Sequence, residues 1–284
     1  MYTAQAVKNL VILVTGATDG LGKQVARDLA AQGATILLHG RSRGKGQATL
    51  REIRDATGNQ KVIYYNADFS SLDAVRRLTE EIQGDQVRLD VLINNAGIGA
   101  GSRQAGREVS RDGYELRFAV NYLAPFLLTH RLLPLLCRST PARIVNVASV
   151  GQQPIDFNNV MLKDGYDGLR AYRQTKLALI MFTFDLAEEL RKRGVTVNSL
   201  HPASLMNTRM VLESDYFRGT MSTVEEGAHA VKYLAMSAEL DDVTGEYFDG
   251  ERRARANSQA YDKEARRRLR MLSEQLTRLK ESNS

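Results

Sequence analysis

The sequence is poor in cysteine and has no apolar run long enough to cross a bilayer. Cys137 is the single cysteine among 284 residues, which excludes an internal disulfide framework and indicates a reducing compartment. No stretch approaches the roughly 18 to 20 apolar residues of a membrane-spanning helix. The run Leu10–Val14 ends at once in a Thr-Gly turn, so we expect no secretory signal. These absences favour a cytoplasmic protein.

Proline and low-complexity sequence are also scarce, and positive charge is concentrated at one end. The five prolines and the lack of internal repeats give no reason to divide the chain before about residue 250. From residue 251 onward ten Lys or Arg accompany five Asp or Glu, which leaves the main body nearly neutral although the net charge is +6. The sequence therefore predicts one domain over residues 1–250 and a basic C-terminal helical extension over residues 251–284.

Short β-branched runs alternate with helical patterns, which is typical of βαβ units and a parallel sheet. Strands are predicted at Leu10–Thr15, Thr35–His39, Val62–Asn66, Val87–Ile93, Arg143–Ala148, Val195–Leu200 and Glu246–Phe248. Helices are predicted at Leu21–Gln32, Lys45–Ala56, Leu72–Gln83, Glu115–Cys137, Leu169–Arg193 and Val224–Ala235. This order predicts an α/β fold, a single doubly wound Rossmann-type parallel sheet of about seven strands with helices on both faces. Its ligands should lie beyond the carboxyl ends of the strands.

A glycine-rich turn joins the first predicted strand to its helix. Glycines at 16, 20 and 22 permit a tight turn and close backbone approach, so a pyrophosphate can bind to the free amides of the helix N-terminus. The candidate contacts in this turn are Gly16, Thr18, Asp19, Gly20, Leu21 and Gly22. We expect the Asp19 carboxylate to point outward, because it would otherwise repel the phosphates. A plain strand-to-helix turn is the alternative, since such a motif alone is weak.

The segment after the second predicted strand carries arginine where a cofactor with a free ribose hydroxyl calls for Asp or Glu. Arg41 and Arg43 follow the glycine turn by about 20 residues, where a guanidinium can pair with the 2′-phosphate of NADP. The alternative is a solvated loop. The missing acid and the two bases together favour NADP(H) as the cofactor.

Two further segments that follow strands are candidates for cofactor contact. Asp68 can accept a hydrogen bond from the adenine amino group, with Phe69 beside it, or can cap the helix that follows. Asn95, Ala96 and Gly97 end the fourth strand, where small and amide residues let the backbone approach a flat ring. We expect this second segment to be half structural, because its amides can also tie neighbouring strands together.

Tyr172 and Lys176 form the most informative pair. A spacing of four places both side chains on one helix face. An ammonium near a phenol favours the phenolate, which would lower the pKa of the tyrosine from about 10 toward that of a working acid or base. Ser149 lies just past a predicted strand and can hold a substrate oxygen, while Asn121 can anchor a water beside Lys176. Singly, these residues are also explained as a solvated pair, a turn serine and a capping asparagine.

Together these motifs resemble the short-chain dehydrogenase/reductase family. The resemblance spans about residues 8–250 and rests on Thr-Gly-x-x-x-Gly-x-Gly at 15–22, Asn-Asn-Ala-Gly at 94–97, Asn121, Ser149 and Tyr-x-x-x-Lys at 172–176. It implies that Tyr172 exchanges a proton with the substrate oxygen, which Ser149 positions. It also implies that Lys176 supports the tyrosine and binds ribose, and that Asn121 completes a proton relay.

A closer resemblance to the branch of retinol dehydrogenase-like enzymes and WW-domain oxidoreductases rests on Arg41, on the residues flanking 172 and 176, and on the tail segment 268–274. This resemblance implies NADP and lipophilic carbonyl substrates. Pro202 matches the proline that the family has after the sixth strand. Thr208 matches a later family residue, and the resemblance implies that it contacts the cofactor. Ala203 departs from the family pattern, which has glycine there.

Two segments are expected to shape the substrate site, Val150–Arg170 and Ser204–Thr220. Their apolar residues can line a pocket or pack as a lid, and the sequence leaves both interpretations open; they are Phe157, Met161, Leu162, Met206, Met210, Tyr216 and Phe217. Glycine and methionine in the second segment suit closure over a bound substrate.

The helix Leu177–Ala187 is apolar nearly all round, so its outer face needs cover from a second subunit or from the terminal helix. We expect a homo-oligomer, most simply a dimer. The tail from Asn257 to Lys280 places apolar residues on one helix face. Docking on its own domain is favoured over pairing with a partner or contact with an anionic membrane surface. Nucleic acid binding is not expected, because the tail has one aromatic residue.

The sequence thus predicts an NADP-dependent oxidoreductase that moves a hydride between NADPH and a small-molecule ketone or aldehyde, with Tyr172 as proton donor and no metal. One alternative is an NADP(H)-binding regulatory scaffold that acts through its basic tail. The intact set of four chemical residues weighs against that alternative, because a sensor needs only the glycine turn. Reduction of the carbon-carbon double bond of an enone on the same fold is not separated from carbonyl reduction.

Overall fold

Eight strands form one sheet in the computed structural model, which describes residues 7–279. The strands are β1 Val11–Val14, β2 Thr35–Gly40, β3 Val62–Asn66, β4 Val91–Asn94, β5 Ala142–Val147, β6 Val195–His201, β7 Tyr247–Asp249 and β8 Arg252–Ala254. Their order is β3-β2-β1-β4-β5-β6-β7-β8, and only the pair β7 and β8 is antiparallel. The chain reverses its direction of growth between β1 and β4, which is where doubly wound sheets bind their ligands.

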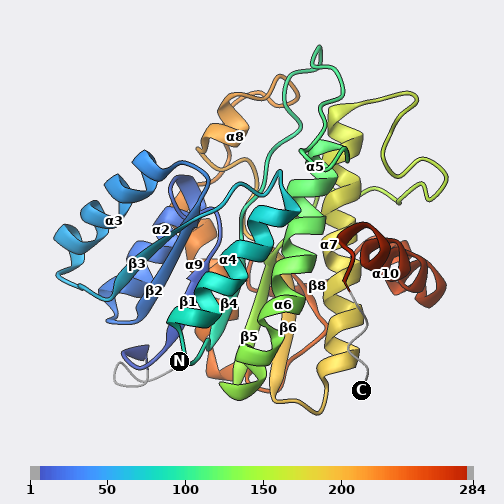
Figure 1. The fold of residues 1–284 in the computed structure, drawn as a ribbon. Coiled ribbons are helices and arrows are strands. Elements are labelled where there is room, and N and C mark those ends of the chain that lie inside the picture. Colours follow the sequence, from blue (N-terminus) through green and yellow to red (C-terminus); the bar gives the residue numbers. More distant parts are fainter. Residues whose placement is uncertain (1–6, 280–284) are drawn as a thin grey trace.

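Helices cover both faces of this sheet (Figure 1). One face packs on α2 Gly20–Ala31, α3 Arg43–Thr57 and α9 Val224–Met236, and the other on α4 Leu72–Asp85, α6 Ala124–Arg138 and α7 Gly168–Leu190. Successive strand residues point to opposite faces. Accordingly Ile12 and Val14 belong to the core on the α2 side, while Leu13 belongs to the core on the α7 side. The predicted fold class is confirmed, with one strand more than the predicted seven.

The structure differs from the sequence prediction at β4, β8 and the long helix after β4. Val87 was predicted to open a strand but is 87% exposed, and β4 begins only at Val91. The helix predicted over Glu115–Cys137 is α5 Leu116–Phe118, a π-helical turn Ala119–Leu123 and α6. Hydrophobic periodicity does not distinguish a π turn inserted into a helix from the helix itself, since both continue the apolar pattern.

The C-terminal helix α10 Lys263–Thr277 packs beside α7 (Figure 1). Ala265 and Leu269 are buried in the same core as α6 and α7, so the apolar outer face of α7 is covered by this helix. The predicted tail ended at Lys280, which lies outside the described residues, as do the remaining residues of the predicted extension. The domain boundary at residue 250 stays a prediction. Within residues 7–279 no helix combines the length and apolarity that a membrane span requires.

Three short helices complete the connections between the larger elements. The helix α8 Arg209–Leu212 lies in the segment after β6, and the 3₁₀ turns η2 Ala238–Leu240 and η3 Ser258–Tyr261 precede β7 and α10. The segment with α8 and the loop before α7 both extend beyond the carboxyl ends of the strands (Figure 1). The segments that were expected to shape a substrate site therefore lie at the ligand-binding edge of the sheet.

Candidate active site

The glycine turn after β1 packs directly against the end of β4. Gly16 has a φ of +64°, and a Cβ on it would lie 2.7 Å from Ala96 Cα, so glycine is required here. Asn95 Nδ2 donates hydrogen bonds to the carbonyls of Thr15 at 2.9 Å and Gly16 at 3.2 Å. Ala96 N donates to Thr15 Oγ1 at 3.0 Å. The amide side chain of Asn95 is therefore used to fix the turn, as its predicted structural role requires.

The turn leads into the N-terminus of α2, where phosphate contacts were predicted. Asp19 is exposed, as expected, but its Oδ1 accepts a hydrogen bond from Gly20 N at 2.8 Å and so caps the helix. Gly22 is the third residue of the helix, Leu21 is buried in the core on the α2 side, and Thr18 is half-buried. Leu21 can therefore offer a phosphate only its backbone.

His39 is a residue of this region that sequence reasoning did not single out. Its Nδ1 accepts a hydrogen bond from Gly16 N at 3.3 Å, and its Nε2 lies 3.1 Å from the carbonyl oxygen of Ala67. Burial lowers the pKa of His39 to about 4, so the ring is neutral at pH 7 and the Nε2 proton is the one donated to Ala67. The ring of Phe69 stacks on His39 at 4.2 Å, which makes Phe69 a packing residue in the structure. The sequence signal that could have identified His39 is a histidine at the end of an otherwise apolar strand.

Arg41 and Asp68 line one groove beside the carboxyl ends of β2 and β3. The groove has a volume of about 460 Å³, and Arg77 and Arg111 also line it. Arg43 is exposed at the first position of α3 and is not among the lining residues, so the structure separates the two predicted arginines. Asp68 does not cap α4, because its Oδ1 accepts from Ser70 N and the cap is Ser71.

Asn121 lies in the π-helical turn and binds the loop that follows β4. Its Oδ1 accepts from Ile98 N at 2.8 Å, and its Nδ2 donates to Ile98 O at 3.0 Å and to Thr175 Oγ1 at 3.2 Å. A Cβ on Gly97 would lie 3.2 Å from Asn121 Oδ1 and 3.8 Å from Lys176 Nζ. Gly97 therefore marks the point where the predicted relay residues Asn121 and Lys176 approach each other.

Ser149 and Tyr172 are brought together by β5 and α7. Ser149 follows β5, and its Oγ accepts a hydrogen bond from Gly151 N at 3.0 Å. Tyr172 lies in the second turn of α7, and a Cβ on Gly151 would lie 3.4 Å from Ser149 Oγ and 3.9 Å from Tyr172 Cε1, so the two side chains approach each other there. Asp167 caps this helix by accepting from Arg170 N, which fixes where the helix begins and hence the position of Tyr172. The two hydroxyl groups that were predicted to contact a substrate oxygen are neighbours.

Lys176 lies one turn after Tyr172 and is only 4% exposed. Its Nζ donates to the carbonyl oxygen of Val147 at 2.9 Å and lies 5.6 Å from the centre of the Tyr172 ring. Burial lowers the pKa of Lys176 to about 8. The expectation that this ammonium lowers the phenol pKa is wrong for this structure: burial raises the pKa of Tyr172, and the Ser149 hydrogen bond only partly opposes that effect. Each of the two pKa shifts has the burial of its own group as the main cause.

The segment after β6 reaches back over the glycine turn. Pro202 is buried directly after β6, and Thr208 begins α8, where its Cγ2 would lie 3.2 Å from a Cβ on Gly20. The Arg103 guanidinium stacks on the Tyr216 ring at 5.0 Å, and the Tyr216 hydroxyl donates to Asp167 Oδ2 at 3.1 Å. The segment is therefore held against the N-terminus of α7.

The apolar residues of the two substrate-shaping segments divide between packing and exposure. Phe157 and Met161 pack on the core beside α7, and Met206 packs on the opposite core. Leu162 is buried as well. Met210 is 38% exposed and Phe217 is 36% exposed. The buried residues follow the packing interpretation, and the pocket interpretation stays a prediction for Met210 and Phe217. Among residues 7–279 no group of three or more His, Cys, Asp or Glu is placed to hold a metal ion.

Comparison with known proteins identifies the family. A sequence model described as short chain dehydrogenase matches residues 10–217. Retinol dehydrogenase 13 of Mus musculus is 36% identical over 274 residues, which cover 91% of this chain and 80% of that protein. A crystal structure of an uncharacterized protein from Mycobacterium paratuberculosis matches 98% of this chain and 97% of its own, with a TM-score of 0.76 and 27% identity.

A second solved structure, a short chain dehydrogenase from Shigella flexneri complexed with NADP, matches 86% of this chain and 97% of its own. Its TM-score is 0.68 and its identity 27%. These matches agree with the convergence of Ser149, Tyr172 and Lys176 at the carboxyl edge of the sheet. The chain belongs to the short-chain dehydrogenase family of oxidoreductases, on the branch that contains the retinol dehydrogenases.

Proposed function

We propose that this protein reduces the carbonyl group of a lipophilic aldehyde or ketone with NADPH, or oxidises the corresponding alcohol in reverse. The observation that carries the proposal is the approach of the Ser149 and Tyr172 side chains at the end of β5, with Lys176 buried one helical turn away. A Cβ on Gly151 would lie 3.4 Å from Ser149 Oγ and 3.9 Å from Tyr172 Cε1. Two hydroxyl donors side by side can hold one carbonyl oxygen. A regulatory scaffold has no use for this pair, and the structure gives that alternative no observation of its own.

The residues divide the chemistry as follows. When bound, NADPH supplies the hydride that adds to the carbonyl carbon. Tyr172 gives its phenolic proton to the oxygen that becomes the alcohol, and Ser149 donates a hydrogen bond to the same oxygen. Lys176 stabilises the tyrosinate left behind, and Asn121 holds the loop at Ile98 and the side chain of Thr175 in place around the lysine. A proton from water then restores the phenol.

The described residues fit a nicotinamide dinucleotide. A side chain at Gly16 would fill the space against Ala96, and a Cβ at Gly97 would fill the space between Asn121 and Lys176. Glycine at 16 lets the turn pack against the end of β4, and glycine at 97 keeps the space beside Asn121 and Lys176 free of a side chain. The groove that Arg41 lines also contains Arg77 and Arg111, against the carboxylates of Asp68 and Glu81. Arg111 pairs with Asp68, which leaves an excess of positive charge beside Arg41. Arg41 supports NADP over NAD, because a guanidinium suits a 2′-phosphate.

The apolar lid supports a lipophilic substrate. We call the segment 204–221 the lid, because its Thr208 lies beside Gly20 of the glycine turn. Leu212 is 66% exposed and Met221 is 76% exposed, and both lie near Met210 and Phe217 in this segment. Exposed apolar side chains on a lid bury surface when an apolar substrate binds beneath it. The retinol dehydrogenases among the relatives act, by their names, on an alcohol of this kind.

An NADPH-consumption screen tests the proposal. The panel contains retinal, an aliphatic ketone, a quinone and an enone, each assayed with the wild-type protein and with Tyr172→Phe. The proposal predicts turnover of at least one aldehyde or ketone by the wild-type protein and loss of that turnover in the variant, with NADPH binding retained. If NADPH is consumed with the enone alone, the protein reduces a carbon-carbon double bond and the carbonyl proposal is wrong. Full activity of Tyr172→Phe would remove the proposed proton donor.

Two further features stay proposals. The homo-oligomer was inferred from the all-round apolar surface of α7, and α10 covers part of that surface within the same chain. A dimer would therefore need a face that α10 leaves free, and light scattering at micromolar concentration decides between monomer and dimer. A cytoplasmic location is likewise proposed from the single cysteine and the reducing compartment that it indicates.

A further inference from the structure

The C-terminal helix touches the π-helical turn that carries Asn121. Tyr122, the next residue in the chain, is 1% exposed, and its hydroxyl lies 2.7 Å from Ser273 Oγ of α10. Ser273 is fully buried and donates its own proton to the carbonyl oxygen of Leu269 at 2.7 Å. Because a serine hydroxyl has one proton, Tyr122 is the donor in the bond to Ser273.

We propose that Ser273 is a positioning residue for Asn121. By accepting the hydrogen bond from Tyr122, it holds the π-helical turn Ala119–Leu123 in the conformation that presents Asn121 to Ile98 and Thr175. The inference rests on the proposed function, because Asn121 matters for turnover only if the site reduces a substrate. The inference assigns a role to α10, a helix from which the proposed mechanism takes no residue.

A π turn needs such support. One extra residue in a helical turn is a rare conformation, found mostly at functional sites, and persists only where its surroundings hold it. Asn121 is fixed on one side by its hydrogen bonds to Ile98 and Thr175. Tyr122 is fixed on another side by Ser273, because neighbouring residues of a helix point in different directions. The turn is therefore held from two sides, and the second hold comes from α10.

The helix that carries Ser273 is itself firmly attached. The last carbonyl groups of a helix lack partners within it, and here Tyr114 Oη donates to Leu276 O at 3.0 Å while Arg76 Nη2 donates to Thr277 O at 2.6 Å. Both donors come from the main body of the protein, so the end of α10 is capped by residues far away in the sequence. Ser273 lies one turn before this cap.

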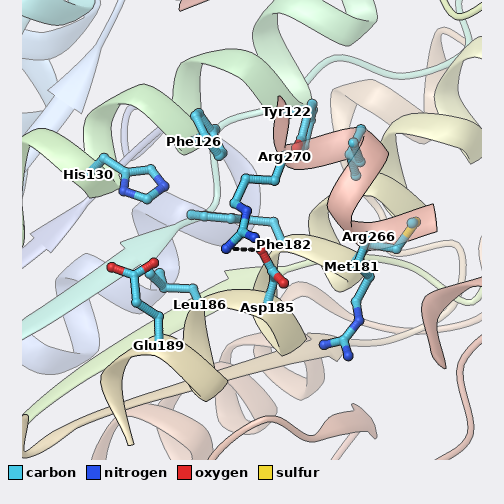
Figure 2. Close-up of a pocket in the computed structure, with 11 residues that line it drawn as sticks. Tyr122, Phe126, His130, Met181, Phe182, Asp185, Leu186, Glu189, Arg266 and Arg270 are labelled. Atoms are coloured by element: carbon cyan, nitrogen blue, oxygen red, sulfur yellow. Dashed lines mark ion pairs between the residues drawn. The ribbon is translucent and has the colours of Figure 1, made fainter. Parts of the chain in front are cut away.

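Ion pairs and close packing join α10 to α7 as well. Figure 2 shows Arg270 of α10 directed at Asp185 of α7, with 3.5 Å between Nη1 and Oδ2, and Arg266 Nη2 lies 2.9 Å from Glu188 Oε1. The hollow in this seam, which Tyr122 and Phe126 help to line, has a volume of about 10 Å³, room for about one water molecule. The two helices are thus packed closely enough for α10 to fix the position of the residues that it contacts.

The segment that precedes α10 supports the other side of the site. Tyr247 Oη donates to the carbonyl oxygen of Ser149 at 3.1 Å, and Gln152 Nε2 donates to the same oxygen at 3.0 Å. Gln152 Oε1 in turn accepts from Asn257 N at 2.7 Å. The C-terminal part of the chain therefore holds the backbone at Ser149 as well as the turn at Asn121.

The test compares Tyr122→Phe, Ser273→Ala and the double variant with the wild-type protein, using NADPH and the best carbonyl of the screen. Tyr122→Phe leaves Ser273 bonded to Leu269, so the protein should fold with little loss of thermal stability. Its kcat should fall about tenfold with KM for NADPH unchanged, because small misplacements of a catalytic group are expensive in rate. Ser273→Ala should lower kcat equally and lower Tm more, because it leaves the Tyr122 hydroxyl buried without an acceptor.

The double variant separates positioning from stability. Removal of both partners should restore much of the Tm lost in Ser273→Ala, yet kcat should stay as low as in Tyr122→Phe. Tyr114→Phe is the matched control, because it removes another phenol hydroxyl that binds α10 but lies outside the π turn. It should keep the wild-type kcat, because Arg76 still binds the carbonyl oxygen of Thr277 and the bond between Tyr122 and Ser273 is intact. A kcat that follows Tm across all four variants would overturn the proposal.

Amide hydrogen exchange gives a readout that does not depend on turnover. Ile98 N donates to Asn121 Oδ1, so its exchange rate reports the position of the Asn121 side chain. Peptides that contain Ile98 should exchange faster in Tyr122→Phe and at the wild-type rate in Tyr114→Phe. Unchanged exchange in Tyr122→Phe would overturn the inference even if the enzyme is active. If Ile98 exchanges faster in Tyr122→Phe but the wild-type protein reduces no carbonyl of the panel, Ser273 still positions Asn121 and the proposed function is wrong.

Discussion

His39 Nδ1 accepts a hydrogen bond from the backbone amide of Gly16, 3.3 Å away, and so ties the glycine turn to the end of β2. The bond requires a neutral imidazole with its proton on Nε2, because a protonated ring has no acceptor. Burial provides that state by lowering the pKa of His39 to about 4. The predicted phosphate site therefore depends on the protonation state of a histidine beneath it.

The first prediction concerns stability in acid. His39 and His130 have pKa values of about 4 in the folded protein, below the ordinary 6.5, so the unfolded chain binds protons more readily between pH 4 and 6.5. Their contribution is complete above pH 6.5 and is lost as the pH falls to about 4, with a slope of up to about 1.4 kcal/mol per pH unit for each group. Urea unfolding at several pH values measures this slope.

His39→Asn provides the comparison for that experiment. Its amide oxygen can still accept from Gly16 N but does not titrate, so the free energy of unfolding should depend less steeply on pH than in the wild-type protein. His39→Asn combined with His130→Asn should flatten the dependence further. An unchanged slope in both variants would show that other groups cause the acid sensitivity.

The second prediction concerns the rate of carbonyl reduction at high pH. Lys176 has a pKa of about 8 because it is buried, so its positive charge is present below pH 8 and is lost above it. Burial raises the pKa of Tyr172, so the proton donor stays protonated through the same window. At saturating substrate, kcat for reduction should fall with an apparent pKa near 8. NADPH binding measured at the same pH values separates a chemical effect from loss of cofactor, and a kcat that rises to pH 10 would contradict the assignment.

The third prediction concerns cofactor choice. Arg41→Ala should lower kcat/KM for NADPH by roughly 10- to 100-fold and leave kcat/KM for NADH nearly unchanged, because a charged hydrogen bond contributes about 1.5–3 kcal/mol. Arg43→Ala is the control, since Arg43 does not line the groove. It should change the ratio little. If kcat/KM for NADH in the wild-type protein equals or exceeds that for NADPH, the preference for NADP is wrong.

The fourth prediction concerns the gap between the relay residues. In Gly97→Ala the new Cβ would lie 3.2 Å from Asn121 Oδ1, so the asparagine must move by a few tenths of an ångström. We expect kcat to fall about tenfold with little change in Tm. Gly106→Ala introduces the same methyl group where nothing lies within 4 Å and should behave as the wild-type protein. Equal kcat values for the two variants would show that Asn121 tolerates displacement.

The sheet was predictable because its strands are short, buried and separated by amphipathic helices. Periodicity placed β3 at its observed bounds and β2 within one residue. It failed at Val87, where an apolar residue is exposed, and at β8, whose sequence Arg-Arg-Ala has no strand pattern. The pairing of β8 depends on the antiparallel contact with β7, which is tertiary information.

The candidate site was predictable where residue type alone determines the chemistry. Ser149 was placed at the carboxyl end of a strand, and the family resemblance implied that it and Tyr172 serve the same substrate oxygen. In the structure both side chains lie near Gly151. The direction in which the Tyr172 pKa shifts was not predictable, because spacing reveals the neighbouring charge but not the extent of burial. Neither His39 nor Ser273 was identified, since each acts through a backbone or a neighbour distant in the sequence.

Deuterium transfer tests the central claim most directly. Incubation with NADPH that carries deuterium at both hydrogen positions of nicotinamide C4 and with the carbonyl found in the screen should yield an alcohol with deuterium on its carbinol carbon, detected by mass spectrometry. Tyr172→Phe should bind the same cofactor and yield no labelled alcohol. Label in the alcohol at the wild-type rate from Tyr172→Phe, or the absence of label from the product of the wild-type protein, would contradict hydride transfer with Tyr172 as the proton donor.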